Sequence, residues 1–171
     1  ATQNPIEQEG TYPLPEAQLD RFLFQIDVDY PKLETERAIL LATTGADTAS
    51  TKRVITPKQL QSLQQLVRKL PIGESIVDAI LKLVRNARPD QTEHDFVRGA
   101  VTWGPGPRAG QALMLASRAK ALMDGRLSPS LDDVAALAAP VLKHRMALSF
   151  AARADGQSLE GIIDKLTKTI G

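Results

Sequence analysis

The stretch TPKQLQSLQQLVRKLP, residues 56–71, indicates that the larger part of this 171-residue chain is helical. It opens with a threonine hydroxyl that can cap a helix, then places proline at the first helical position and glutamine at the third, which together form a capping box. Leucine and valine then recur at positions 60, 63, 66, 67 and 70, so that they share one helical face. These features predict an amphipathic helix that stops at Pro71.

Similar patterns lie on both sides of this stretch. Helical spacing of apolar residues predicts further helices over residues 33–44, 74–88, 107–124 and 159–170. A second capping box at Ser130–Asp133 begins another helix, which Pro140 is expected to interrupt or restart. About six short helices without an internal repeat are typical of a compact bundle.

The first 31 residues differ in composition from the rest of the chain. They hold six acidic residues and one basic residue, a net charge of −5, whereas the remainder carries +6 and the whole chain +1. Within them, residues 22–28 alternate between apolar and polar side chains, which predicts a half-buried strand. A single strand needs partners, and this sequence does not supply them. We therefore expect two bodies, joined near Tyr30–Pro31.

Composition excludes several classes of protein and of site. With 43% hydrophobic and 24% charged residues, the chain is neither disordered nor collagen-like nor a coiled coil. It contains no cysteine, which excludes disulfides, thiolate metal sites and a cysteine nucleophile, and which fits a reducing compartment such as the cytoplasm. No apolar run approaches the roughly 20 residues that span a bilayer, so no membrane span is expected.

Residues typical of catalytic sites are scarce. The two histidines, His94 and His144, lie far apart in the sequence and are interpreted as structural or surface residues. No metal-ligand motif or cluster of carboxylates occurs, so no metal site is expected. The glycine-rich pattern G-x-x-x-x-G-K-[ST] is also absent, so this chain by itself contains no phosphate-binding loop.

Two short segments near the start of the chain carry polar groups suited to phosphate chemistry. In ATQNP, residues 1–5, the amide of Asn4 could orient a water molecule or contact a phosphate oxygen, although Asn-Pro is also a common turn signal. Arg21 stands at the entry to the predicted strand, and its planar guanidinium could stabilise charge on a transferring phosphoryl group. Alternatively, Arg21 forms a local salt bridge to Asp20 or Glu16.

A third segment, WGPGPRA at residues 103–109, places Arg108 in the first turn of a helix. The helix dipole does not favour a cation at this end, which suggests a separate role for Arg108, such as holding an anion at the amide-rich end of the helix. The alternative is an exposed arginine without a partner.

Together, these segments resemble the C-terminal half of a MoxR-type AAA+ ATPase. ATQNP is similar to the family's first sensor, GTYPLPEAQLDRFLF to its arginine-finger segment, and GPGPRA to its second sensor. Further similarity follows in Gly125–Arg126, in LAAPVLKHRM at residues 137–146 and in a turn at residues 152–156, so that the resemblance covers essentially the whole chain. In the loop before Arg108, Pro105–Gly106–Pro107 replaces a more common alanine or serine.

The resemblance implies a mainly α fold, in which a helical lid bundle at residues 31–171 follows a short α/β remnant of the AAA+ core at residues 1–30. It also implies three site residues. Asn4 would be the first sensor and would position the attacking water. Arg21 would be the finger that enters the neighbouring subunit's nucleotide site, and Arg108 the second sensor that reads the phosphate from the lid.

For the full-length protein, the resemblance further implies ATP and Mg²⁺ as cofactors. It implies a homo-oligomeric ring, commonly a hexamer, that remodels or matures partner proteins, including proteins with a von Willebrand factor A domain. The family's phosphate loop and magnesium motif precede the first sensor, and this sequence begins at that sensor without a methionine. We therefore expect a piece of a longer protein that, alone, binds no nucleotide tightly and hydrolyses no ATP.

Two other classes of function stay open at this point. One is a helical nucleic-acid-binding domain, because residues 32–171 carry a net charge of +6. Its basic residues are scattered without a dense run, and few aromatic residues are placed for base stacking, which disfavours nucleic acid. The other is a helical protein-interaction module in which Asn4, Arg21 and Arg108 share no purpose.

Overall fold

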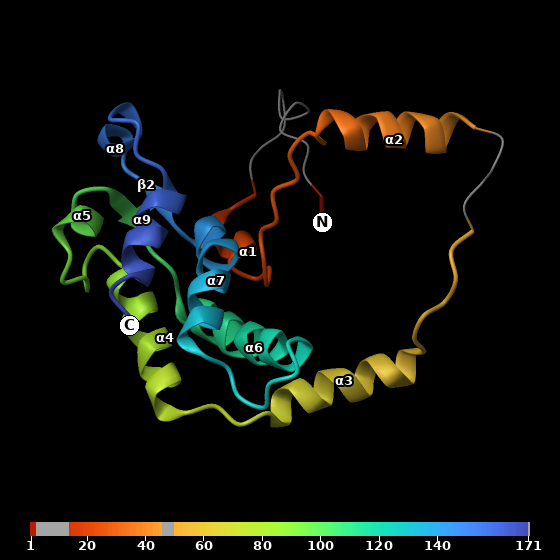
Figure 1. Ribbon diagram of the computed structural model, residues 1–171. Coiled ribbons are helices and arrows are strands. Elements are labelled where there is room, and N and C mark those ends of the chain that lie inside the picture. Colours follow the sequence, from red (N-terminus) through yellow and green to blue (C-terminus); the bar gives the residue numbers. More distant parts are fainter. Residues whose placement is uncertain (3–13, 46–49, 171) are drawn as a thin grey trace. The chain divides into compact units, whose positions relative to one another are not determined.

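The computed structural model describes residues 1–2, 14–45 and 50–170 (Figure 1). The chain divides into two compact units. One contains Ala1–Gln25 and Val67–Gly171, and the other contains Ile26–Leu66. Each unit is described by itself below.

The smaller unit holds helix α2 (Leu33–Thr44) and most of α3 (Pro57–Lys69). The capping box predicted at the start of α3 is present, since the Thr56 amide donates to Gln59 Oε1 at 2.8 Å and the Gln59 amide donates to Thr56 Oγ1 at 3.2 Å. Neither helix buries a residue in the described structure. Their apolar faces are therefore exposed.

The larger unit is a helical bundle around one apolar core. It contains α4 (Glu74–Asn86), α5 (Asp95–Arg98), α6 (Pro107–Met123), α7 (Leu131–Leu142), the 3-10 helix η2 (Lys143–Arg145), α8 (Phe150–Ala154) and α9 (Leu159–Thr167). Helix α7 packs against α4, α6 and α9 (Figure 1). The apolar positions that predicted these helices point inward, and the core includes Ile80, Leu83, Leu113, Leu142, Ile163 and Leu166. The prediction of a mainly helical bundle is confirmed.

A short sheet, which the sequence patterns did not predict, joins two distant parts of this bundle. Strand β1 (Val101–Trp103) pairs antiparallel with β2 (Ala147–Leu148), with Val101 opposite Leu148. Strands of two and three residues are too short to show a period-two pattern in sequence. The pairing brings the start of the loop before α6 close to the residues that follow η2.

The predicted strand at residues 22–28 is wrong, because these described residues contain neither helix nor strand. A short helix, α1 (Glu16–Leu19), precedes them. The physical reason is that, in the part of the chain that the structure describes, no strand lies beside this segment to pair with it. Instead, the amide of Gln25 donates to the carbonyl of Pro140, at 2.9 Å.

The interruption expected at Pro140 is also wrong, because α7 continues through this residue to Leu142. Only two helical residues follow the proline, and the chain then tightens into η2. A proline so near a helix end removes one hydrogen bond without breaking the preceding turns. Among the described residues, no helix is both long and apolar enough to cross a membrane.

Candidate functional site

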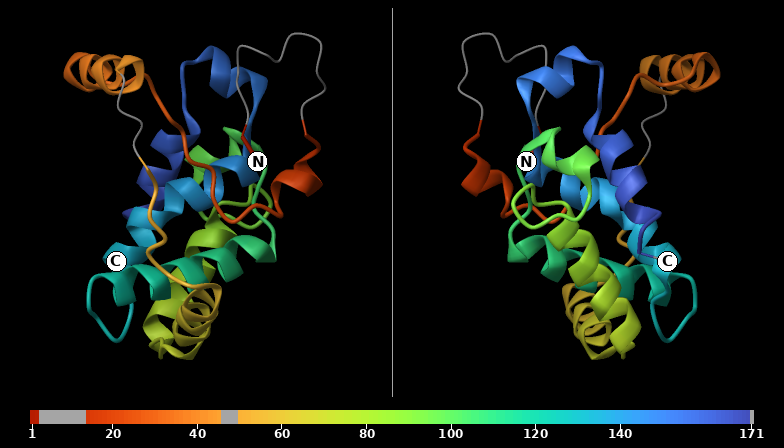
Figure 2. Two further views of the ribbon diagram at one scale, coloured as in Figure 1. Left: turned by 90° about the vertical axis from the view of Figure 1, so that its right-hand side faces the viewer. Right: turned by 90° about the vertical axis from the view of Figure 1, so that its left-hand side faces the viewer.

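The structure brings two of the three predicted site residues into one region. Arg21 is exposed and directly follows the turn after α1, and Arg108 is the second residue of α6, with 54% of its side chain exposed. Asn4 lies outside the described residues. Figure 2 shows α1 at the margin of the bundle, next to the end of α6 where Arg108 lies.

Asp20 links these two places. Its Oδ2 atom accepts a hydrogen bond from Arg108 Nη1 at 3.0 Å, and its Oδ1 atom accepts one from Arg145 Nε at 3.1 Å. The carboxylate is mostly buried, with 15% of the side chain exposed. Both oxygens are therefore bound by arginines of the bundle, and the alternative of a local salt bridge between Asp20 and Arg21 is not realised in the described structure.

Arg145 is the residue of this region that sequence reasoning missed. Its side chain is 2% exposed. Besides Asp20 Oδ1, its guanidinium donates to the carbonyl of Asp20 at 3.0 Å, to that of Phe22, and to that of Val141 at 2.5 Å. Burial lowers the pKa of Arg145 and Asp20 offsets part of this effect, yet an arginine keeps its charge near neutral pH.

One sequence signal could have pointed to Arg145. An arginine two or three residues after the apolar end of a helix costs free energy to bury unless carbonyls and a carboxylate surround it. Local patterns do not show which acceptors those are, because Asp20 is 125 positions away.

His144 holds the same segment from the neighbouring position of η2. Its Nε2 atom lies 3.1 Å from the carbonyl oxygen of Phe22, which accepts the hydrogen bond. The buried Nδ1 atom has no hydrogen-bond partner among the described residues. Burial lowers the pKa of His144, partly opposed by the bond to Phe22. The residue is therefore a neutral structural histidine, in line with its interpretation from sequence.

The loop before α6 is fixed by a close backbone approach. A Cβ atom on Gly104 would lie 2.7 Å from the carbonyl oxygen of Ala87 and 2.8 Å from the Cα atom of Arg88, so only glycine fits there. Arg88 Nε donates to the carbonyl of Pro105 at 2.8 Å. These contacts set the point from which α6 starts and hence the position of Arg108.

The start of α6 combines a helix N-terminus with an arginine, although Pro107 has no N–H group and the Ala109 amide already donates to the Gly106 carbonyl at 3.1 Å. Its N-cap residue, Gly106, provides no side-chain cap, and the first turn contains no acidic residue. The helix dipole favours an anion at such an end. Arg108 adds a guanidinium with five N–H groups, of which Asp20 engages one. The arrangement could hold a phosphate group, if one approached this end of α6.

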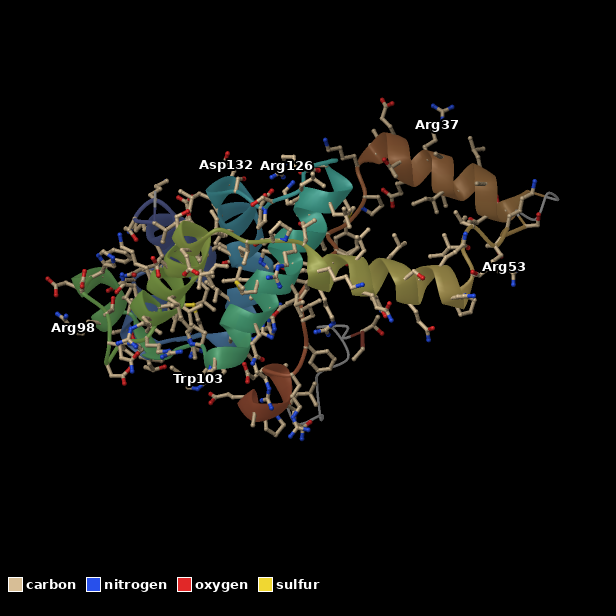
Figure 3. The ribbon with its side chains drawn as sticks, turned by 90° about the horizontal axis from the view of Figure 1, so that it is seen from below. Arg37, Arg53, Arg98, Trp103, Arg126 and Asp132 are labelled. Carbon is tan, nitrogen blue, oxygen red and sulfur yellow. The ribbon has the colours of Figure 1, made fainter. Side chains whose placement is uncertain are left out.

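A second ion-pair cluster stabilises the opposite end of α6 (Figure 3). Arg126 donates to Asp133 Oδ2 at 2.7 Å and Oδ1 at 2.6 Å, and the predicted capping box between Ser130 and Asp133 is present. Arg126 lowers the pKa of Asp133 to about 2, and Ser130 contributes to this effect. The cluster explains Gly125–Arg126 as a structural turn, with Gly125 at a φ of 74°.

Within the described ranges, no group of three or more histidine, aspartate or glutamate residues is placed to hold a metal ion.

Comparison with known proteins defines the class of this fold. The family model of the AAA lid domain matches residues 95–166, and that of an ATPase family associated with various cellular activities (AAA) matches residues 1–24. A crystal structure described as that of "a putative ATPase" from Cytophaga hutchinsonii superimposes with a TM-score of 0.91 at 29% identity, over 99% of this chain and 52% of that one. The bundle therefore has the fold of an AAA lid domain.

Two curated relatives show which kind of AAA ATPase this chain resembles. The chain is 39% identical to Chaperone MoxR1 of Mycobacterium tuberculosis, over 99% of this chain and 45% of the relative. It is 32% identical to Protein MoxR of Paracoccus denitrificans, over 87% of this chain and 48% of that protein. The chain thus spans about half the length of these relatives. It resembles the C-terminal half of a MoxR-type AAA+ ATPase, as its motifs predicted.

Proposed function

We propose that this chain is the lid-bearing part of a MoxR-type AAA+ ATPase that couples ATP binding and hydrolysis to remodelling or chaperone-like maturation of partner proteins. Residues 1–30 are the end of the nucleotide-binding core, and residues 31–171 are the lid domain. The matches to an AAA ATPase family at residues 1–24 and to the lid domain at residues 95–166 support this division.

One observation carries the proposal: Asp20, the residue before the proposed finger Arg21, is ion-paired to the proposed second sensor Arg108. In a ring, Arg21 enters the neighbouring subunit's nucleotide site and stabilises charge on the transferring phosphoryl group. Arg108 reads the phosphate in its own subunit, and Asn4 positions the attacking water. ATP and Mg²⁺ bind mainly to core motifs that this sequence does not contain.

The Asp20–Arg108 pair also suggests how nucleotide is sensed. A phosphate group carries more negative charge than a carboxylate, and a guanidinium binds phosphate through two parallel hydrogen bonds. Because 54% of the Arg108 side chain is exposed, a phosphate can compete with Asp20 for it. Arg108 then exchanges one partner for the other as the lid closes.

Complementation in the full-length protein tests the two arginine roles. Arg21→Ala and Arg108→Ala should each abolish ATP hydrolysis while the helical circular-dichroism signal is kept. Mixed rings should regain activity, because an intact Arg108 site in an Arg21→Ala subunit can receive the finger of an Arg108→Ala neighbour. Arg98→Ala is the matched control, since Arg98 is an exposed lid arginine whose charged partner, Asp95, lies in its own helix. Failure of the mixed rings to recover would show the finger assignment to be wrong.

A second experiment tests the 171-residue chain alone. Calorimetric titration with ATP and Mg²⁺ should show no micromolar binding, and phosphate release should equal that of a buffer blank. The reason is that this sequence has no phosphate loop to hold the β- and γ-phosphates. Turnover above the blank would contradict the proposal. The ring, its hexameric size and a partner with a von Willebrand factor A domain are parts of the same proposal.

A further inference from the structure

A single buried side chain holds the backbone on both sides of Arg21. Arg145 donates from Nη2 to the carbonyl of Asp20 and to the carbonyl of Phe22, the residues immediately before and after Arg21. It also donates from Nε to the carboxylate of Asp20. The segment that carries Arg21 is therefore bound by one guanidinium at two backbone carbonyls and one side-chain carboxylate.

The other side of this guanidinium is anchored in the bundle. Nη1 donates to the carbonyl of Val141 at 2.5 Å, near the end of α7, and the side chain is 2% exposed. A planar guanidinium holds its donors in a rigid fork, so its acceptors cannot move independently without breaking hydrogen bonds. Because the group is buried, water cannot replace a lost acceptor at low cost.

Two neighbouring contacts reinforce the same attachment. His144 binds the carbonyl of Phe22 through Nε2, and the carbonyl of Pro140 accepts the amide of Gln25. All these bundle groups lie within the end of α7 and the 3-10 helix η2 that follows it. The segment with Arg21 is thus attached to one place in the lid.

We propose that Arg145 is a positioning residue for Arg21: it ties the finger segment to the lid of its own subunit, so that the finger keeps its orientation toward the neighbouring nucleotide site. This inference rests on the proposed role of Arg21 as the finger. Arg145 does not itself contact nucleotide in this assignment. It acts through the backbone carbonyls of Asp20 and Phe22 and through the Asp20 carboxylate.

The proposal places Arg145 in the same complementation group as Arg21. An Arg145→Gln subunit should lack a correctly placed finger but keep its own Arg108 site. In mixed rings of the full-length protein, it should therefore regain ATP hydrolysis with Arg108→Ala subunits, and should not regain it with Arg21→Ala subunits. Its affinity for ATP should change less than twofold, whereas its kcat as a homogeneous ring should fall at least tenfold.

A residue with only a general structural role would behave differently. Loss of the lid fold would damage the subunit's own site as well, and neither partner would restore activity. Arg98→Gln, a change at an exposed lid arginine, is the control and should behave as wild type in every mixture. Amide hydrogen exchange, followed by mass spectrometry, should speed up over residues 20–25 in Arg145→Gln and not in Arg98→Gln.

The outcomes separate this inference from the proposed function. If Arg21→Ala and Arg108→Ala restore each other and Arg145→Gln is restored by Arg108→Ala alone, the inference holds. If Arg145→Gln is restored by Arg21→Ala, the inference is overturned. If Arg21→Ala and Arg108→Ala do not restore each other, the finger role fails, and the inference fails with it.

Arg145→Lys is a second test variant, which is used if Arg145→Gln does not fold. A lysine keeps the charge and can reach one or two acceptors, but it lacks the fork that binds all of them. It should fold, show the same complementation pattern as Arg21→Ala and retain partial activity. Full wild-type activity in Arg145→Lys, or restoration by neither partner in a folded ring, would overturn the positioning role.

Discussion

The Nη1 atom of Arg108 lies 3.0 Å from the Oδ2 atom of Asp20, so the residue before Arg21 is bonded to the arginine at the start of α6. The two residues are 88 positions apart in the sequence. The carboxylate next to Arg21 in the chain thereby contacts Arg108, and the family resemblance assigns these two arginines to different nucleotide sites. This connection gives the lid a physical means of affecting the segment that carries Arg21.

We predict that Asp20→Asn lowers the free energy of unfolding by about 1–3 kcal/mol. The amide keeps one acceptor but removes the charge that faces the buried Arg145 guanidinium. The exposed Arg108 contributes little to this loss, because solvent screens its ion pair. Urea titration followed by circular dichroism measures the change.

The control for this prediction is Asp155→Asn. Asp155 is exposed and follows α8, so its replacement should change the free energy of unfolding by less than about 0.5 kcal/mol. Equal effects of the two substitutions would contradict the role given to Asp20.

Asp133 should make the free energy of unfolding depend on pH in the acidic range. Its pKa is lowered from 3.8 to about 2 in the folded state, mainly by Arg126, so the unfolded chain binds the proton more tightly. The resulting stabilisation, about 2 kcal/mol, is present above pH 3.8 and is lost as the pH falls toward 2. Asp133→Asn should therefore be less stable than wild type at pH 6, and the difference should shrink between pH 4 and pH 3.

Urea titrations at several pH values measure this difference directly. Asp132→Asn serves as the control, because Asp132 is the exposed neighbour of Asp133 in the first turn of α7 (Figure 3). A difference between wild type and Asp133→Asn that stays constant from pH 6 to pH 3 would rule out the proposed linkage.

His144 should also make the free energy of unfolding depend on pH, in this case near neutrality. Burial lowers its pKa below the ordinary 6.5, so the unfolded state binds more protons than the folded state as the solution is acidified. Stability is therefore expected to fall as the pH drops below about 6.5. Protonation would also add an N–H group at Nδ1, the second donor of the ring, and the described residues provide no acceptor for it.

His144→Gln can keep a donor for the carbonyl of Phe22 while it removes the titration. We expect the decrease in unfolding free energy between pH 7.5 and pH 5.5 to be smaller in this variant than in wild type. His94→Gln should keep the wild-type decrease, since His144 is still present. Identical pH profiles of wild type and His144→Gln would contradict the prediction.

Gly104 and Gly110 form a matched pair for testing the loop before α6. In Gly104→Ala, the new methyl group would meet the backbone at 2.7 Å and 2.8 Å, so the loop must shift, at a cost of about 1–3 kcal/mol. In Gly110→Ala, the nearest atom is Ile80 Cγ2 at 3.9 Å, and the higher helix propensity of alanine should stabilise α6 by up to about 1 kcal/mol.

Thermal melts of both variants provide the measurement. The melting temperature should fall in Gly104→Ala and stay equal or rise in Gly110→Ala. If Gly104→Ala melts at the wild-type temperature, the close approach to Ala87 does not constrain the loop.

Most of the helices could be predicted because their signals are local. The capping boxes at Thr56 and Ser130 and the helical spacing of apolar residues each depend on neighbours within a few positions. The strand predicted at residues 22–28 shows the limit of such signals. Alternation indicates a face to bury, but a strand also needs a partner, and the local pattern does not reveal whether one is present.

For the candidate site, the sequence by itself determined which residues are proposed to carry the chemistry: the motif order and spacing singled out Asn4, Arg21 and Arg108, together with the family that they resemble. Only the tertiary structure decided what Asp20 binds and that the buried Arg145 holds the backbone around Arg21. The physical reason is that these contacts join positions 88 and 125 residues apart. A buried ion pair is specified by the packing that removes water from it, and no short stretch of sequence encodes that packing.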